Sequence, residues 1–304
     1  MVFLIVLKKT LLHISFNIDR TGLQGLGATV NSLLANCSQP ETLYFHFLCS
    51  NLPSRYKQAI TELLKELGFS GEFRFWDFDA EVEFAGLPAF HNNYTVYGRL
   101  LIPKLIDADQ VLYLDTDLIV TVDVLLFQKI ALGNYLIGAI SRGTIANSLD
   151  KEFFINQGIP TDTPYFNAGV LLINVKRWRQ QQIERSWREL AFQNSTQLTA
   201  HDQTILNAIC NGSFYKFGVE LNTPLMGNMR VDDNATGIFH FIGSPKPWDF
   251  LGRYLHNGYW IWKSYSLRSW QQHFKLFSII GMSRSWNIRR SLVKSILQHF
   301  QPQF

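Results

Sequence analysis

Cysteine is scarce in this 304-residue chain, and long apolar runs are missing. The three cysteines have unrelated spacings and no Cys-x-x-Cys pair, which argues against a disulfide framework or a zinc site and indicates a reducing compartment. No stretch reaches the roughly 18 uninterrupted apolar residues that a membrane-spanning helix needs. Residues 2–7 are apolar, but two lysines follow them, whereas a signal peptide has its charges first. We therefore expect an N-terminal extension or part of a first strand there.

Acidic residues are absent from the last part of the chain. Residues 1–249 carry 20 basic and 24 acidic side chains, a net charge of −4. Residues 250–304 carry eight basic and no acidic side chains, a net charge of +8. We therefore predict a globular domain over residues 1–249 and a basic, aromatic-rich extension over residues 250–304, each facing different surroundings. The hydrophobic content of 47% and charged content of 17% are typical of a protein with a substantial interior.

Strand-like and helix-like segments alternate along the first 250 residues, which favours an α/β sheet. Strands are expected at residues 11–16, 43–48, 73–76, 111–114, 135–140, 170–174 and 238–242. Helices are expected at residues 26–36, 55–67, 94–106, 180–193 and 202–211, with a kink at Pro103 in the third. Residues 86–93 and 222–234 are rich in Gly and Asn and are predicted to form loops over a site.

Asp115 and Asp117 interrupt an otherwise apolar segment. A buried strand that ends in two carboxylates delivers charge to its carboxyl end, where open α/β sheets bind ligands. Charge at that place is costly unless something pairs with it, and a divalent cation carrying a phosphate ligand would do so. Taken alone, the pair could equally mark a turn or a helix cap.

Other polar residues stand where a nucleoside diphosphate ligand would need them. Asn17 and Asp19 end the first strand, and residues 165–169, 201–203 and 239–248 contribute further polar groups. Each has an ordinary structural explanation as well. Asn167 could be a turn residue, Asp202 a helix cap, His240 a core histidine and Lys246 a solvated charge.

Together these segments resemble glycosyltransferase family 8, especially bacterial enzymes that extend lipopolysaccharide or lipooligosaccharide. The likeness covers roughly residues 11–250 and rests on residues 112–117, 165–169, 202–203 and 240–248, in that order and spacing. It implies a GT-A fold, that is, a mixed, mainly parallel sheet flanked by helices. It also implies a nucleotide-sugar donor, dependence on Mn²⁺ with Mg²⁺ as the alternative, and retention of anomeric configuration.

The resemblance also assigns roles to individual residues. It places the metal on Asp115, Asp117 and His240, and the diphosphate on Gly243 and Lys246. The donor sugar would be contacted by Arg99, Asn167, Asp202 and Gln203, of which Asp202 and Gln203 are the expected catalytic pair, and the nucleoside by Asn17 and Asp19. Two positions depart from the pattern. Thr21-Gly22 stands where relatives often have an aromatic beside the base, and Arg142 replaces an acid near the acceptor, which makes an acidic or phosphorylated acceptor plausible.

The resemblance predicts a hexosyltransferase that moves glucose or galactose from a UDP-sugar to a glycan hydroxyl, on a lipopolysaccharide or another lipid-linked glycan. Three alternatives stay open at this point. These are a glycogenin-like enzyme that glucosylates itself or another protein, a nucleotidyltransferase, and a non-catalytic sugar-nucleotide-binding module associated with a membrane.

The end of the chain predicts a basic amphipathic helix. Between residues 282 and 300, helical spacing places Met282, Trp286, Val293, Ile296, Leu297 and Phe300 on one broad face. Arg289, Arg290 and Lys294 flank that face, and Arg284 lies opposite. This pattern is typical of a helix lying in a membrane interface. We therefore expect a peripheral protein on the cytoplasmic face of an anionic membrane. An ordinary packed helix is the alternative, and nothing else in the chain supports nucleic-acid binding.

Overall fold

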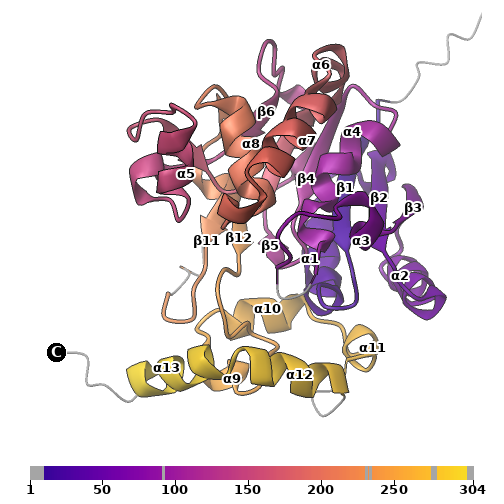
Figure 1. The fold of residues 1–304 in the computed structure, drawn as a ribbon. Helices are drawn as coiled ribbons and strands as arrows, with labels where there is room; N and C mark the ends of the chain where they lie inside the picture. Colours follow the sequence, from indigo (N-terminus) through magenta and orange to yellow (C-terminus); the bar gives the residue numbers. More distant parts are fainter. Residues whose placement is uncertain (1–9, 91–92, 230–231, 233–234, 275–278, 300–304) are drawn as a thin grey trace, which may run out of the picture.

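The computed structural model describes residues 10–90, 93–229, 232, 235–274 and 279–299 (Figure 1). The expectation for the first nine residues and the placement of Phe300 lie outside these ranges. Within them, a seven-stranded sheet forms the centre of the molecule, in the order β10-β6-β9-β4-β1-β2-β3. Its strands are β1 (Leu12–Ile18), β2 (Leu43–Ser50), β3 (Glu72–Phe78), β4 (Gln110–Leu114), β6 (Ile137–Ala139), β9 (Val170–Asn174) and β10 (Tyr215–Lys216).

The sheet is mixed but mainly parallel, as predicted. Strand β9 runs antiparallel to both of its neighbours, β4 and β6, while all other neighbouring pairs are parallel. The central strands are continuous apolar runs because helices cover both faces of the sheet. In a parallel arrangement the carboxyl ends of β1 and β4 meet at one edge, so Asn17 and Asp19 come close to Asp115.

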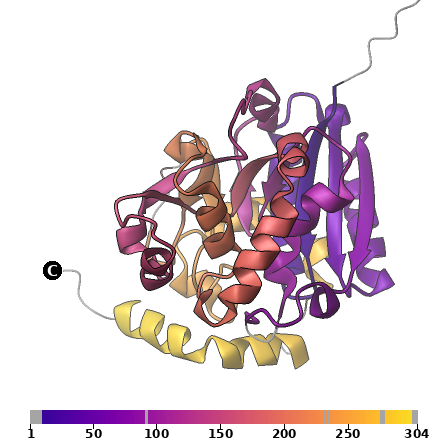
Figure 2. The same cartoon turned by 45° about the horizontal axis from the view of Figure 1, so that its top comes forward.

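Helices cover the two faces of the sheet and create two large apolar cores (Figures 1 and 2). One core lies under α1 (Leu23–Ala35) and α2 (Ser54–Glu66). The other lies under α7 (Ile183–Gln193), α8 (Asp202–Cys210) and shorter helices. The shorter helices are α3 (Ala80–Glu83), α4 (Ile102–Leu105), α5 (Lys151–Asn156) and α6 (Val175–Gln180).

Two small sheets complete the part of the fold that holds the site. Strands β11 (Thr223–Pro224), β12 (Ile238–His240) and β5 (Leu118–Val120) form one, and β7 (Ser141–Thr144) with β8 (Pro164–Phe166) form the other. Strand β12 is antiparallel to β5 with His240 opposite Leu118. Because Leu118 directly follows Asp117, this register brings a histidine from late in the chain to the two aspartates.

Two predicted helices have a different form in the structure. Residues 94–106 are a 3₁₀ segment, Thr95–Leu101, followed by the single turn α4. Pro103 fits in the first turn of α4, where no intrahelical N–H is needed, and Gly98 weakens a longer α-helix. The predicted helix 180–193 is divided between α6 and α7, because Gln182 has a left-handed φ of 53°.

The basic C-terminal segment contains α9 (Gly252–Leu255), α10 (Tyr259–Tyr265), α11 (Arg268–Gln271), α12 (Ile279–Asn287) and α13 (Arg289–His299). Its first helices are anchored to the sheet domain. Trp262 and Trp270 are buried, and the Trp270 indole donates a 3.2 Å hydrogen bond to the Leu23 carbonyl of α1. Gly27 of α1 leaves the space for this ring, because a Cβ there would lie 2.2 Å from it.

The last two helices extend along one side of the molecule (Figures 1 and 2). The predicted single helix is two helices, since α12 ends at Asn287 and the Arg289 side chain donates to the carbonyl of Trp286. Met282, Trp286, Val293 and Leu297 of the predicted apolar face are exposed, whereas Leu292 is buried. None of the helices in the described ranges is long and apolar enough to cross a bilayer. The division of the chain at residue 249 remains a prediction.

Candidate active site

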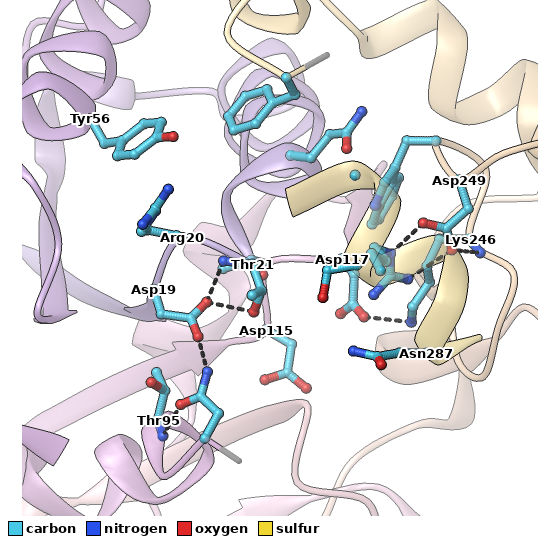
Figure 3. A pocket seen from close by; sticks show the side chains of 18 of the residues that line it. Asp19, Arg20, Thr21, Tyr56, Thr95, Asp115, Asp117, Lys246, Asp249 and Asn287 are labelled. Atoms are coloured by element: carbon cyan, nitrogen blue, oxygen red, sulfur yellow. Dashed lines mark hydrogen bonds and ion pairs between the residues drawn. The ribbon is translucent and has the colours of Figure 1, made fainter. Parts of the chain in front are cut away.

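A pocket of about 1420 Å³ opens at the carboxyl ends of β1 and β4 (Figure 3). Several parts of the chain line it. They are the early segment around Asp19, part of α2 around Tyr56, residues between Phe90 and Arg99, residues 113–117, and C-terminal residues between Gly243 and Ile288. The pocket therefore lies where parallel α/β sheets bind ligands.

Asp115, Asp117 and His240 form a compact group, and its two aspartates line the pocket. One ligand atom from each lies within 4.8 Å of the others. The His240 Nε2 atom is 3.2 Å from an Asp117 oxygen and 3.6 Å from an Asp115 oxygen. Gly169 leaves room for the group, because a Cβ at this position would lie 2.3 Å from the imidazole and 2.8 Å from Asp115. Two carboxylates and one imidazole within this distance suit a divalent cation such as Mn²⁺ or Mg²⁺.

A chain of side-chain amides fixes the tautomer of His240. The Gly169 N–H donates to Asn167 Oδ1, so the Asn167 oxygen must point this way. Asn222 donates from its amide nitrogen to the same oxygen, 2.9 Å away. The Asn222 oxygen must then accept from His240 Nδ1–H, at 3.0 Å. This arrangement leaves the lone pair of Nε2 directed at the two aspartates, as a metal ligand requires.

The same chain of amides holds Gln203. Its Oε1 accepts hydrogen bonds from the Asn167 amide, at 3.1 Å, and from the Ala168 N–H, at 3.0 Å. Its Nε2 donates to the Tyr165 hydroxyl. Asn167 and Gln203 are therefore in contact, as members of one site should be. Asn222 is not among the predicted site residues, because it lies in a predicted loop and carries no motif of its own.

Arg99 lies between Asp115 and Asp202. Its guanidinium is 3.1 Å from an Asp115 oxygen and 2.8 Å from an Asp202 oxygen, and it stacks 4.3 Å over the Tyr113 ring. Burial raises the pKa of Asp202 to about 6, against the opposing effect of Arg99, and Asp115 adds to the rise. Asp202 therefore holds its proton more tightly than an ordinary aspartate.

Asp202 and Gln203 begin α8, and a second buried acid fixes the segment before them. Asp150 accepts hydrogen bonds from the Thr199 N–H at 2.7 Å and the Thr204 hydroxyl at 2.6 Å. His201, between them, has a φ of 54°, a strained conformation for a residue with a side chain. Asp150 was not predicted either, because its role depends on contacts about 50 residues away.

Lys246 completes the base of the pocket. Its ammonium is 2.7 Å from Asp117 and also donates to the Phe241 carbonyl. Burial alone would raise the pKa of Asp117, but Lys246 and His240 together lower it well below its usual range. Gly243 lines the same wall with a φ of 75°, a left-handed conformation that favours glycine.

Asn17 and Asp19 both line the pocket, and Figure 3 shows Asp19 beside Arg20 and Thr21 at the end away from Lys246. Asp19 accepts from the Thr21 N–H at 2.7 Å and the Gly22 N–H at 2.9 Å, and Asn93 donates to its other oxygen. Asn17 donates to the Thr95 carbonyl and packs against Gly98. No aromatic ring stands at Thr21-Gly22.

Aromatic rings nevertheless line this end of the pocket from other parts of the chain. Tyr56 of α2 and Phe274 both line it, with nearly parallel rings whose centroids are 6.4 Å apart. The other departure, Arg142, is exposed and donates to the Asn222 carbonyl. Its guanidinium is partly buried even though the residue as a whole is exposed, and this partial burial lowers the pKa of Arg142.

Comparison with known proteins gives a consistent result. The profile described as "Glycosyl transferase family 8" matches residues 13–252. The lipopolysaccharide 1,3-galactosyltransferase of Salmonella typhimurium is 27% identical over 268 residues, which cover 82% of this chain and 76% of that protein. Glycosyltransferase GlyF of Streptococcus pneumoniae is 30% identical over 167 residues, or 52% of this chain. That match spans only 39% of GlyF.

A solved structure agrees with these sequence matches. The crystal structure of galactosyltransferase LgtC, in complex with donor and acceptor sugar analogues, superposes with a TM-score of 0.70 and 26% identity. The match covers 86% of this chain and 99% of LgtC, which confirms the predicted GT-A fold. Since the family profile spans most of the chain and the sheet carries the fold of that family, the chain belongs to glycosyl transferase family 8.

Proposed function

We propose that this glycosyltransferase moves a hexose, glucose or galactose, from a UDP-sugar to a hydroxyl of a lipid-linked glycan such as lipopolysaccharide, with retention of anomeric configuration. The observation that carries the proposal is the group Asp115, Asp117 and His240, with Lys246 beside it, at one large pocket that its two aspartates line. Two acids, an imidazole and an ammonium group in contact suit a metal-bound diphosphate better than an uncharged ligand.

Asp115, Asp117 and His240 would hold Mn²⁺, or alternatively Mg²⁺. The metal would supply a Lewis acid for the diphosphate oxygens. Lys246 adds a point charge that neutralises the departing phosphate once the diphosphate displaces it from Asp117. The backbone at Gly243, without a Cβ, lets phosphate approach closely.

The residues around Arg99 would orient the donor sugar. Asp202, with its raised pKa, and Asn167 offer hydrogen-bonding groups to sugar hydroxyls. The bond from the anomeric carbon to the phosphate oxygen breaks, and the acceptor oxygen forms its bond on the same face. The acceptor proton passes to the departing phosphate. Gln203 is a poor nucleophile because its amide oxygen already accepts two hydrogen bonds, so we favour this displacement over a covalent glycosyl-enzyme.

Two basic features, Arg142 and the helices α12 and α13, support the proposed acceptor and the proposed location. Arg142 is exposed near the Asn222 end of the site and suits an acidic or phosphorylated group on the acceptor. The exposed face of α12 and α13 combines Met282 and Trp286 with flanking arginines, which suits an anionic lipid surface. We therefore infer peripheral attachment to the cytoplasmic face of a membrane, where a lipid-linked acceptor is available.

A Mn²⁺-dependent hydrolysis assay on a panel of nucleotide sugars tests this function. Release of UDP from UDP-glucose or UDP-galactose, lost on addition of a chelator, is the expected result. Transfer to the chain itself would instead favour the glycogenin-like alternative. Binding of nucleotide sugars with neither hydrolysis nor transfer to any glycan would favour the non-catalytic module.

A further inference from the structure

We infer that helix α12 is a wall of the donor pocket, and that Arg284 and Asn287 take part in binding the donor's diphosphate. This inference rests on the proposed function and extends it to a segment outside the family profile, which ends at residue 252. Six residues from this segment line the pocket: Gly281, Ser283, Arg284, Ser285, Asn287 and Ile288. The pocket is therefore bounded on one side by the basic tail.

A buried carboxylate fastens α12 in this position. The side chain of Asp249 is only 2% exposed, and the Arg284 guanidinium donates to both of its oxygens, one of them at 2.7 Å. Asp249 also accepts from the N–H of Lys246, at 2.7 Å. One carboxylate thus joins the tail helix to the turn that carries the phosphate-binding lysine (Figure 3). Because a charge buried this deeply needs its partner, the contact is expected to be specific.

Asn287 lies one helical turn after Arg284, on the same face of α12. Figure 3 shows its amide directed into the pocket on the side of Asp117 and Lys246. An amide can donate to a phosphate oxygen. The Arg284 guanidinium uses Nε and one terminal nitrogen to bind Asp249, so the N–H groups of its other terminal nitrogen would donate to the diphosphate. The other face of the helix exposes Met282 and Trp286. One helix thus carries both the pocket wall and the surface that suits a lipid bilayer.

Calorimetric titration of the full-length protein with UDP in the presence of Mn²⁺ tests the inference. Arg284→Gln and Asn287→Ala should each weaken UDP binding about tenfold, the cost of one charge-assisted hydrogen bond. Arg284→Lys, which keeps the charge but not the paired contact, should lose less than Arg284→Gln. Arg268→Gln is the matched control, because it removes a charge from the same segment at an exposed position outside the pocket. It should bind UDP within about twofold of the wild type.

Hydrogen exchange supplies a readout that a purely structural role would not change. Because coupling is reciprocal, saturation with UDP and Mn²⁺ should slow amide exchange across residues 281–288. Unaltered exchange there, together with wild-type UDP affinity in both pocket variants, would overturn the inference and leave the proposed function intact. If Arg284→Gln lowers the melting temperature while Asn287→Ala binds UDP normally, α12 is only a packed helix. Failure of the wild type to bind UDP contradicts the proposed function itself.

Discussion

The two sides of the pocket are built in different ways. At the metal side, Asp115, His240 and Gln203 belong to networks in which side-chain amides and backbone N–H groups fix one another. At the tail side, an ion pair between Arg284 and Asp249 ties α12 to the turn that carries Lys246, and Met282 and Trp286 on the outer face of the helix are exposed. The side that holds the aspartates is preorganised by these networks, whereas the tail wall is held by an ion pair between two distant segments.

The two sides should therefore respond differently to substitution. A substitution at the metal side should remove activity without shifting the backbone, because the strands beneath it are packed in the core. A change in the tail should act through the position of one helix. The following predictions are ordered from the largest expected effect to the smallest.

Replacing Asp117 should produce the largest loss. Asp117→Ala removes one of the proposed metal ligands and the partner of Lys246, and even outer partners of metal ligands cost roughly 10–100-fold when lost. We expect sugar transfer to fall more than about 100-fold at limiting Mn²⁺, with an unchanged melting temperature. Asp77→Ala is the control, since Asp77 of β3 is exposed and forms an ion pair with Lys57 of α2. Near-normal transfer by Asp117→Ala would remove this residue from the metal site.

Because Asn222 sets the tautomer of His240, two substitutions of Asn222 should lower Mn²⁺ affinity to different degrees. Asn222→Ala removes the acceptor for His240 Nδ1–H, so Mn²⁺ affinity should fall by about 10–100-fold. Asn222→Asp keeps an acceptor oxygen and should retain most of that affinity, although it loses the donation to Asn167. Electron paramagnetic resonance of Mn²⁺ binding compares the two variants. Equal losses would mean that Asn222 does not set the tautomer.

The raised pKa of Asp202 predicts a pH dependence of stability. Between its ordinary value of 3.8 and about 6, the folded state keeps a proton that the unfolded chain has lost. The stabilisation is fully present below pH 3.8 and is lost as the pH rises towards 6. Relative to Asp202→Asn, the wild-type free energy of unfolding should therefore fall by roughly 2–3 kcal/mol over this range. Urea titrations at several pH values, in the presence of a chelator, measure the free energy of unfolding of both proteins. If the free energies of the wild type and Asp202→Asn change with pH in the same way, the Asp202 pKa is ordinary.

The exposed tail face should show the smallest effect, confined to lipid binding. Replacing Met282 and Trp286 together by Ser should lower partitioning onto anionic vesicles about tenfold, because two exposed apolar side chains no longer enter the interface. Hydrolysis of a soluble donor should change little. Val219→Ser serves as the control, because Val219 is an equally exposed apolar residue outside the tail. Unchanged vesicle flotation would contradict the membrane proposal and leave the tail as a packed element only.

Several features of this protein were determined by the sequence alone. The apolar runs of the central strands and their alternation with helices predicted the α/β sheet, because a strand covered on both faces has no polar side to present. The aspartates at the end of β4 predicted a divalent-metal site, the family resemblance added His240, and the structure brings all three together. The local helix spacing also predicted an apolar face in the tail, and most of its described residues are exposed.

Only the tertiary structure decided which long-range partners complete the site. Asn222 reaches His240 and Asn167 through the pairing of β11 with β12, and Asp150 holds a segment about 50 residues away. Arg284, placed by helical spacing opposite the apolar face, meets Asp249 because the preceding helices turn the tail back across the pocket. Such contacts depend on packing between distant segments. Periodicity can show which face of a helix is polar, but only the fold determines what that face touches.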